Sequence, residues 1–374
     1  MKVLRTDDSV LGRWWWTVDR FLLFAVLILC CIGAMLSFSA TPAIAHHLKL
    51  GTYFLVNHQL VFLGLAVVAM IGISMQSPKN IRLLSVLLLA VTFVLLVGVL
   101  LYGDKIKGAA RWIRLFGVSI QPSEFAKPAF AVVAAWLIST GRDNPEFKGM
   151  TAACVVYGLL VALLIKQPDF GMTMTVSVIF FAELFVAGLP FILVAVLSLI
   201  GSIGATLAYF TLPHVQVRVD KFLHPEAGDT YQVRTAFDAI KSGGLFGIGP
   251  GEGVIKNILP DAHTDFILAV AVEEFGLIPV LFLVFLFAAI VLRGFYLIFS
   301  KNKNLFTLLA VSGILTQFGM QALVNMASTL SMIPTKGMTL PFISYGGSSL
   351  LSTGFAMGVV LGLTRNTSTG RENK

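Results

Sequence analysis

Charged residues are scarce in this chain of 374 residues, since Asp, Glu, Lys and Arg together make up only 12% of it. Soluble domains carry about 25% charged residues, which excludes an ordinary soluble enzyme. Cysteine is rarer still, and Cys30, Cys31 and Cys154 all lie inside apolar runs, so neither a disulfide framework nor a zinc site is indicated. Hydrophobic residues make up 57% of the chain, including 30 Phe, whereas disordered chains lack such residues. The composition therefore predicts an integral membrane protein.

The net charge of the chain is +8, and its pI is near 9.4. A basic chain can bind nucleic acid. In a protein this apolar, however, an anionic lipid or an anionic lipid-linked substrate is the better match. We therefore expect contacts with membrane lipid and no nucleic-acid partner.

Apolar runs of about 20 residues, long enough to cross a membrane, recur about ten times along the chain. They are expected at 20–40, 55–75, 81–102, 122–140, 151–166, 172–188, 190–212, 265–293, 305–329 and 346–364. The predicted fold class is all-α: a polytopic membrane protein with about ten transmembrane helices. Residues 1–374 are expected to form a single transmembrane domain.

An even number of spans places both termini on the same side of the membrane. The distribution of Lys and Arg favours the cytoplasm for the N-terminal segment 1–19 and the tail 365–374. A large extracytoplasmic loop, 213–264, then joins helices 7 and 8. Cytoplasmic loops usually hold the excess of Lys and Arg. Here the outer segments 103–121 and 213–264 hold four and five of these cations, which nearly removes that bias. This distribution indicates that something anionic binds at the outer surface.

The fourth expected span opens with closely spaced polar residues. Pro122 suits the first turn of a helix, and Gln121 or Ser123 can cap its free amides. Glu124 and Lys127 are three residues apart and so share one helix face. An ion pair that holds the helix in the bundle explains them. A functional site does so too, because an ionisable residue at the centre of a span costs about 2.5–3.5 kcal/mol, and a buried Lys can hold a phosphate.

Two further groups of polar residues lie at expected outer ends of helices. Asp169 follows Gln-Pro and precedes Phe-Gly, so it is explained equally by helix capping and by function. The outer loop ends in Leu-Pro-Asp-Ala-His263-Thr264-Asp265, in which Thr264 or Asp265 could cap the eighth span. A carboxylate at a membrane boundary tends to have a raised pKa, which suits a general base. Two more acids, Glu273 and Glu274, lie deeper in the same span.

The segment from 333 to 349 interrupts apolar sequence with two prolines and a Gly-Gly pair. It is expected to be re-entrant or broken, and such backbone is tolerated at membrane depth only inside protein or beside a wet cavity. Lys336 is expected to point at the same outer surface as the other cations.

Together these segments resemble the SEDS (FtsW/RodA) family of polytopic cell-wall proteins, over nearly the whole chain. The motifs that carry the resemblance are Lys107-Gly-Ala-Ala-Arg-Trp-Ile113, Gln121-Pro-Ser-Glu-Phe-Ala-Lys127, Gln167-Pro-Asp-Phe-Gly171, Leu259-Pro-Asp-Ala-His-Thr-Asp265, Glu273-Glu274 and Pro341-Phe-Ile-Ser-Tyr-Gly-Gly347. Asp169-Phe170 and Lys336-Gly-Met-Thr-Leu-Pro341 are more similar to the division branch than to the elongation branch of the family.

The resemblance implies a ten-helix peptidoglycan glycosyltransferase that polymerises lipid II at the outer face of the bacterial inner membrane during septal cell-wall synthesis. It implies Asp265 as the catalytic residue, and it matches Glu124, Lys127 and Asp169 to family positions. The implied partners are a class B penicillin-binding protein, an FtsI-like transpeptidase, and other divisome proteins at the division septum. The chain departs from the family pattern at His58, where Arg is usual, and at Ala110, where a basic or polar residue is common.

The residues point to the same chemistry. Lipid II is an anionic pyrophosphate, so glycosyl transfer needs a base for the attacking sugar hydroxyl and cations for the leaving group. Asp265 is the candidate base, and Arg111, Lys127 and Lys336 are the candidate cations. The remaining expected substrate-binding residues are Gln121, Ser123, Glu124, Asp169, His263 and Thr264. A divalent cation could assist, but no ligands with metal-like spacing are evident, so no cofactor and no metal site are predicted.

Two other functions remain open at this point. A lipid II flippase would use intramembrane charges such as Lys127, Glu273 and Glu274, together with broken helices. A non-catalytic divisome scaffold that recruits a transpeptidase is the third reading. Transport needs charged groups at mid-membrane with access from both sides. The polar motifs cluster instead at the outer ends of the expected helices, which favours the enzyme.

Overall fold

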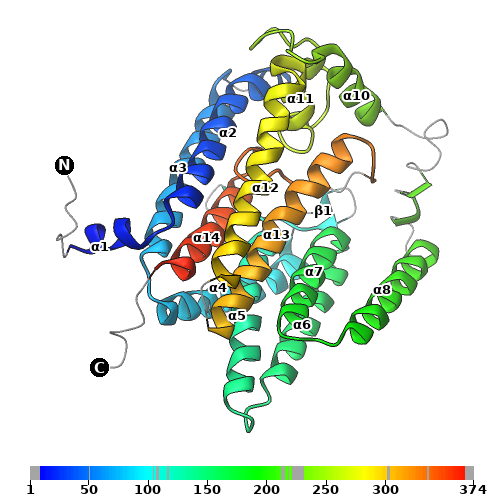
Figure 1. Ribbon diagram of the computed structural model, residues 1–374. Coiled ribbons are helices and arrows are strands. Elements are labelled where there is room, and N and C mark those ends of the chain that lie inside the picture. Colours follow the sequence, from blue (N-terminus) through cyan, green and yellow to red (C-terminus); the bar gives the residue numbers. More distant parts are fainter. Residues whose placement is uncertain are drawn as a thin grey trace.

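The computed structural model describes residues 9–49, 51–103, 105–106, 109–115, 118–211, 215–217, 219–220, 231–300, 304–334 and 337–366. Figure 1 shows that these residues form a helical bundle. The helices are α1 Val10–Thr17, α2 Arg20–His47, α3 Phe54–Ser74, α4 Pro78–Tyr102, α5 Pro122–Asp143, α6 Gly149–Lys166, α7 Phe170–Val186, α8 Phe191–Thr211, α10 Tyr231–Gly243, α11 Ile267–Phe275, α12 Leu277–Phe299, α13 Leu305–Thr329 and α14 Gly347–Thr364, with a 3₁₀ turn η1 at Ile255–Asn257. The predicted helical membrane fold is confirmed.

Strands occur in only one part of the described chain, between α4 and α5. β1 (Lys105–Ile106) pairs antiparallel with β2 (Ala109–Ala110), and β3 (Ile113–Leu115) pairs antiparallel with β4 (Val118–Ile120). The register of the second hairpin places Ile113 opposite Ile120. These hairpins carry the first of the two basic outer segments, including Arg111, toward the start of α5.

Seven of the described helices are long and apolar enough to cross a membrane: α2, α3, α4, α6, α12, α13 and α14. Two other helices at predicted spans differ from these in length or charge: α7 has 17 residues, and α5 carries four ionisable residues. The chain is thus a multi-pass membrane protein, and the count of ten spans stays a prediction.

The eighth span was predicted as one helix over 265–293, and this is wrong. The helix is interrupted at Gly276, whose φ of 83° ends α11 before α12 begins. The Gly-rich loop after α10 packs against the break, because the amide of Leu277 donates to the carbonyl of Gly244 at 3.0 Å. A Cβ at Gly276 would lie 2.4 Å from the carbonyl oxygen of Leu245. Positive φ and this close approach both require glycine, and the helix cannot continue.

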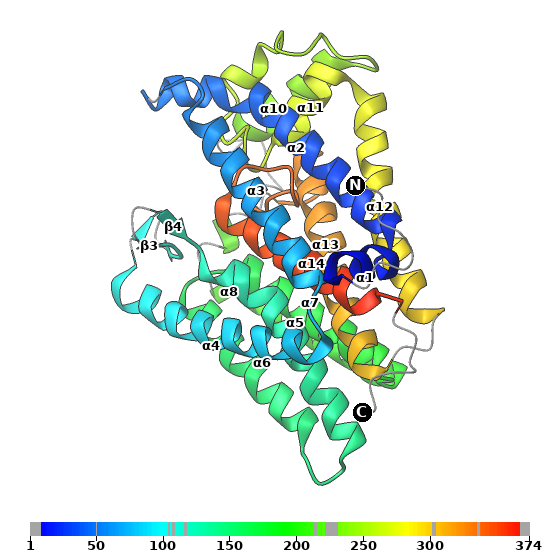
Figure 2. The ribbon, with the colours of Figure 1, turned by 90° about the vertical axis from the view of Figure 1, so that its left-hand side faces the viewer.

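Three helices form the interior of the bundle. Nearly every residue of α5 is buried from Pro122 to Ala135, and most residues of α13 and α14 are buried as well. Figure 2 shows α14 running through the middle of the molecule, between α3 and α5, against which it packs. Helices α3, α4 and α6 face outward along much of their length, and α8 stands apart from the bundle in Figure 1. Glu124 and Lys127 of α5 are therefore shielded from lipid by other helices.

The described residues between α13 and α14 are non-helical, as the prolines predicted, and most of those from 338 to 344 are buried. Leu340, Phe342, Ile343 and Ser344 are each buried, and Phe342 adopts a φ of 62°. The backbone here is satisfied locally, since the amide of Leu340 donates to Ser344 Oγ at 2.8 Å. Irregular backbone is stable at this depth because protein surrounds it.

Candidate functional site

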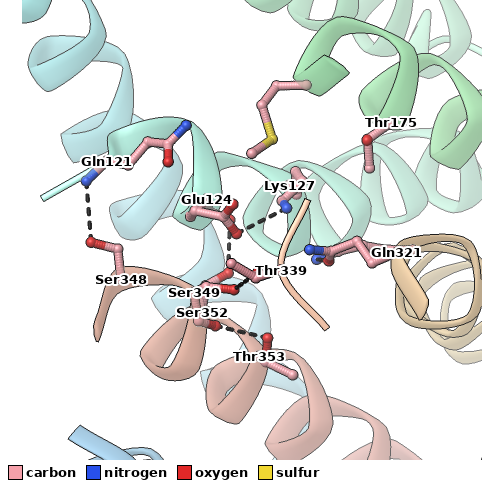
Figure 3. A network of polar contacts seen from close by, with 12 residues as sticks. Gln121, Glu124, Lys127, Thr175, Gln321, Thr339, Ser348, Ser349, Ser352 and Thr353 are labelled. Carbon is pink, nitrogen blue, oxygen red and sulfur yellow. Dashed lines mark hydrogen bonds and ion pairs between the residues drawn. The ribbon is translucent and has the colours of Figure 1, made fainter. Parts of the chain in front are cut away.

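The start of α5 brings the first group of candidate residues into the bundle. Pro122 occupies the first turn, as predicted, but the expected side-chain cap from Gln121 is absent. Instead the backbone amide of Gln121 donates to Ser348 Oγ of α14 at 3.1 Å. Ser352, one turn further along α14, donates from Oγ to the carbonyl of Glu124 at 2.7 Å. The N-terminal end of α5 is therefore positioned by α14 (Figure 3).

Glu124 and Lys127 form a buried ion pair. Lys127 Nζ lies 2.9 Å from Glu124 Oε2, and the two residues are 1% and 5% exposed. The predicted pairing across one helix face is confirmed. Figure 3 shows Gln321 of α13 and Thr175 of α7 on the same side as the Lys127 ammonium. This arrangement places a charged group of each sign in a polar region among α5, α7, α13 and α14.

Arg111 and Asp169 add a second pair of charges. Arg111 Nε lies 3.9 Å from Asp169 Oδ2, and the Arg111 guanidinium also donates to the carbonyl of Pro168. Asp169 caps α7 by accepting from the amide of Met172 at 3.3 Å, so the capping interpretation is confirmed without excluding a further role.

The electrostatics of Asp169 connect it to the pair on α5. Burial raises the pKa of the Asp169 carboxyl, and Arg111 opposes this shift. Glu124 also raises the pKa and Lys127 lowers it, so the charges of both residues act on Asp169. The structure therefore brings together two cations and two carboxylates that are spread over 59 positions of the sequence, from 111 to 169.

The Leu259–Asp265 motif lies against the segment between α13 and α14. Ser344 Oγ donates to the carbonyl of Thr264, and the amide of Tyr345 donates to the carbonyl of His263 at 2.8 Å. The side-chain amide of Asn325 donates to the carbonyl of Asp265 at 3.0 Å. Three successive residues, 263–265, are thus held by their backbone carbonyls.

The alternative in which Thr264 or Asp265 occupies the N-cap of the eighth span does not match the structure. Helix α11 begins at Ile267, and its N-cap position is Phe266. Residues 261–266 form turns in which Thr264 Oγ1 donates to the carbonyl of Asp261 at 3.2 Å. The helix starts later than predicted because Asp261 adopts a φ of 54° and the turns that follow it satisfy the local backbone.

His263 is an uncharged member of this group near neutral pH. Burial lowers the pKa of its imidazole to about 4, although Asp261 opposes the shift. Its ring lies 5.1 Å from that of Tyr345, and its buried Nδ1 has no hydrogen-bond partner among the described residues. A neutral imidazole can accept or donate a hydrogen bond but supplies no charge.

Lys336 lies outside the described residues. The next residue, Gly337, has a φ of 65°, and a Cβ there would lie 3.5 Å from Asp265 Oδ2. The chain around position 337 therefore passes close to the Asp265 carboxylate. Among the described residues, no group of three or more His, Cys, Asp or Glu is arranged to hold a metal ion.

Several residues that hold the site together were not among the predicted substrate-binding residues. Gln59 of α3 donates from Nε2 to the carbonyl of Ser344 at 3.1 Å and accepts at Oε1 from the amide of Gly346 at 3.3 Å. Its neighbour His58 lies with Nδ1 3.0 Å from the hydroxyl of Tyr345. The sequence signals were the polarity of His58 and Gln59 inside an apolar run and the departure from the family pattern at His58. Neither signal indicated a partner 287 positions away. Thr339 and Ser349 complete the link to α14, with hydroxyls 2.6 Å apart.

Comparison with protein families and curated relatives agrees with this arrangement. The family model described as "Cell cycle protein" (FtsW, RodA and SpoVE) matches residues 20–369. The chain is 43% identical over 362 residues to the probable peptidoglycan glycosyltransferase FtsW of Caulobacter vibrioides, covering 96% of this chain and 93% of that protein. It is 38% identical to the protein of the same name from Trichlorobacter lovleyi, covering 92% and 93% of the two chains.

Solved structures share the fold. One chain, from a study titled "Structural coordination of polymerization and crosslinking by a peptidoglycan synthase complex", matches with a TM-score of 0.76 at 28% identity, covering 94% of this chain and 98% of that one. The rod shape determining protein RodA of Thermus thermophilus matches with a TM-score of 0.68 at 28% identity, covering 95% and 99%. The chain belongs to the FtsW/RodA/SpoVE family of cell cycle proteins.

Proposed function

We propose that this protein is a peptidoglycan glycosyltransferase that polymerises lipid II into glycan strands at the outer face of the membrane. The observation that carries the proposal is the position of Asp265. Its backbone is held by Asn325, and the chain at Gly337 passes beside its carboxylate. The similarity to proteins named probable peptidoglycan glycosyltransferase supports the same activity.

In the proposed reaction, Asp265 acts as the general base. It removes the proton from the attacking sugar hydroxyl as the new glycosidic C–O bond forms, and the bond to the pyrophosphate of the donor breaks. The pyrophosphate leaves with the electron pair of that bond. Negative charge therefore grows on the leaving group, and cations positioned beforehand stabilise it.

Arg111 and Lys127 are the described cations proposed for this role, with Lys336 as the third. Each described cation has a carboxylate beside it, Asp169 for Arg111 and Glu124 for Lys127. Pairing offsets the cost of holding a buried cation while the site is empty. Gln121, Ser123, His263 and Thr264 are proposed to contact the sugar and phosphate groups, because they lie in the same two motifs.

The proposed partner is a class B penicillin-binding protein, an FtsI-like transpeptidase, at the septum of the bacterial inner membrane, together with other divisome proteins. One structural neighbour comes from a study of a peptidoglycan synthase complex that combines polymerisation and crosslinking. A polymerase that releases strands into such a complex would supply the substrate for crosslinking.

The features that suggested a transporter have structural explanations in local contacts. The Glu273 carboxylate accepts from the amides of Ile255 and Lys256 at 2.7 and 3.0 Å. Glu274 forms an ion pair with the Lys256 ammonium. Both acids therefore hold the turn η1 against α11, and Lys127 is paired with Glu124.

The test is glycan-strand formation by the purified protein supplied with lipid II, with and without its penicillin-binding partner. We expect polymer in the presence of the partner and none when Asp265 is replaced by Asn. Movement of lipid II across a vesicle bilayer without polymer formation would favour the flippase instead. Neither polymer nor movement, in a folded complex with the partner, would favour the scaffold.

A further inference from the structure

Glu183 is a buried carboxylate that the proposed reaction does not use. It lies 13 residues after the start of α7, about 20 Å along the helix axis from the end that carries Asp169. Its exposure is 0%, and neither carboxylate oxygen has a hydrogen-bond partner among the described residues. No described Lys or Arg forms an ion pair with it. A buried carboxylate without a partner is strongly destabilising, so something must neutralise it.

Helix α13 leaves space for this carboxylate. A Cβ at Gly313 would lie 2.3 Å from Glu183 Oε1, so only glycine allows the acid to reach this depth between α7 and α13. Gln317 lies one turn along α13 from Gly313 and therefore shares its face. The Glu183 carboxylate consequently faces a stripe of α13 that begins at Gly313 and continues to Gln317.

Two side chains of α13 that are close to Gly313 in sequence carry oxygen atoms that lack partners among the described residues. Gln317 is 3% exposed, and its Nε2 donates to Gln321 Oε1 at 3.3 Å. Its Oε1 has no hydrogen-bond partner among the described residues. Ser312, which precedes Gly313, is 0% exposed with an equally unpartnered Oγ. Buried polar atoms without partners in a native structure call for a bound water or ion.

The chemistry of these groups suits one class of ligand. All are hard oxygen donors, which favour hard cations over transition metals. One carboxylate balances a single positive charge, and the amide and hydroxyl add none. A divalent ion would leave an uncompensated charge inside the bundle, which is costly.

We propose that Glu183, Gln317 and Ser312 form a binding site for a monovalent alkali cation, Na⁺ or K⁺, between α7 and α13. The same two helices carry residues of the candidate functional site, since Asp169 caps α7 and Asn325 of α13 holds Asp265. A cation bound between α7 and α13 therefore sets the spacing of the helices that carry this site.

The experiment measures thermal unfolding of the purified full-length protein as Na⁺ or K⁺ replaces N-methylglucamine at constant ionic strength. A ligand that binds only the folded state raises the melting temperature in a saturable way. We expect this rise for the wild type and for the control Glu146→Gln, which removes an exposed acid between α5 and α6. Glu183→Gln should abolish the rise, and equilibrium dialysis with radioactive Na⁺ should find about one ion per chain only where Glu183 is present.

Gln317→Leu provides a second variant that keeps the carboxylate, and it should shift the cation dependence to higher concentration. The proposal would be overturned if the wild-type melting temperature did not depend on Na⁺ or K⁺ but rose as the pH fell. Glu183 would then carry a proton. A cation dependence that persists unchanged in Glu183→Gln would overturn it equally. Because these readouts do not involve lipid II, failure here leaves the proposed polymerase activity untouched.

Discussion

The side-chain amide of Asn325 donates to the backbone carbonyl of Asp265 at 3.0 Å. The same amide donates to the carbonyl of Met338 at 2.7 Å. One buried residue of α13 thus joins the motif that ends at Asp265 to the irregular segment between α13 and α14. The position of the proposed base depends on an interaction across 60 positions of sequence.

Replacing Asn325 by Leu should reduce both stability and polymerisation. The buried carbonyl of Met338 loses its donor, and the carbonyl of Asp265 keeps only the longer contact from Thr329 Oγ1 at 3.4 Å. An unsatisfied buried group costs about 1–3 kcal/mol. Thermal unfolding and strand formation on the same purified variant measure the two effects. Ser328→Ala is the matched control, because Ser328 lies on the same helix and donates only to the carbonyl of Asn325, within α13. Equal losses in both variants would contradict a specific role for Asn325.

Asp265→Asn should abolish most polymerisation while leaving the fold intact. The amide keeps the shape of the side chain but cannot accept the proton, and loss of a general base slows a reaction about 10²–10⁴-fold. Stability should change little, because Asn has the same shape as Asp and the N-cap position of α11 is Phe266. If Asp265→Asn polymerised lipid II within a few fold of wild type, the base would have to be another acid, with Asp169 and Glu124 as the next candidates.

Lys127→Met should destabilise the protein by about 3–5 kcal/mol, because Glu124 is left buried without its partner. The double variant Glu124→Gln with Lys127→Met removes both charges and should recover most of that stability. Activity should stay low in both variants if Lys127 stabilises the leaving group. Recovery of strand formation in the double variant would show that the pair is structural only.

The lowered pKa of His263 predicts how stability changes with pH. The pKa of His263 in the folded protein is about 4, against an ordinary value of 6.5. The unfolded state therefore takes up a proton first as the pH falls, so stability is complete above about 6.5 and declines toward pH 4. His263→Gln should lose less stability over this range. The raised pKa of Asp169 changes stability with pH in the opposite sense. Because Asp169 is present in both proteins, the difference between them isolates the contribution of His263.

The predicted topology places the loop after α10 outside the cell and the turn between α5 and α6 inside. Phe246 is 80% exposed and Phe147 is 39% exposed, so a cysteine at either position should be reachable from its own side. In a cysteine-free background, an impermeant thiol reagent should label Phe246→Cys in intact spheroplasts. It should label Phe147→Cys only after disruption. The reverse pattern would invert the assigned orientation.

The membrane class, the approximate positions of the helices and the contacts between residues close in sequence could all be predicted from the sequence. Apolar runs identify helices because lipid requires their backbone to be satisfied within each segment. The pairing of Glu124 with Lys127 could be predicted because helix geometry places residues three apart on one face. The irregular path near 333–347 followed from its prolines and glycines.

The contacts between helices and loops that are distant in sequence could be seen only in the tertiary structure. The break at Gly276 depends on the approach of Leu245, 31 positions earlier, which no hydrophobic pattern encodes. The contacts of Gln59 with Ser344 and of Asn325 with Asp265 join helices that are distant in sequence. Hydrogen bonds of this kind depend on which helices pack together, and apolar lipid-facing sequence constrains that packing weakly.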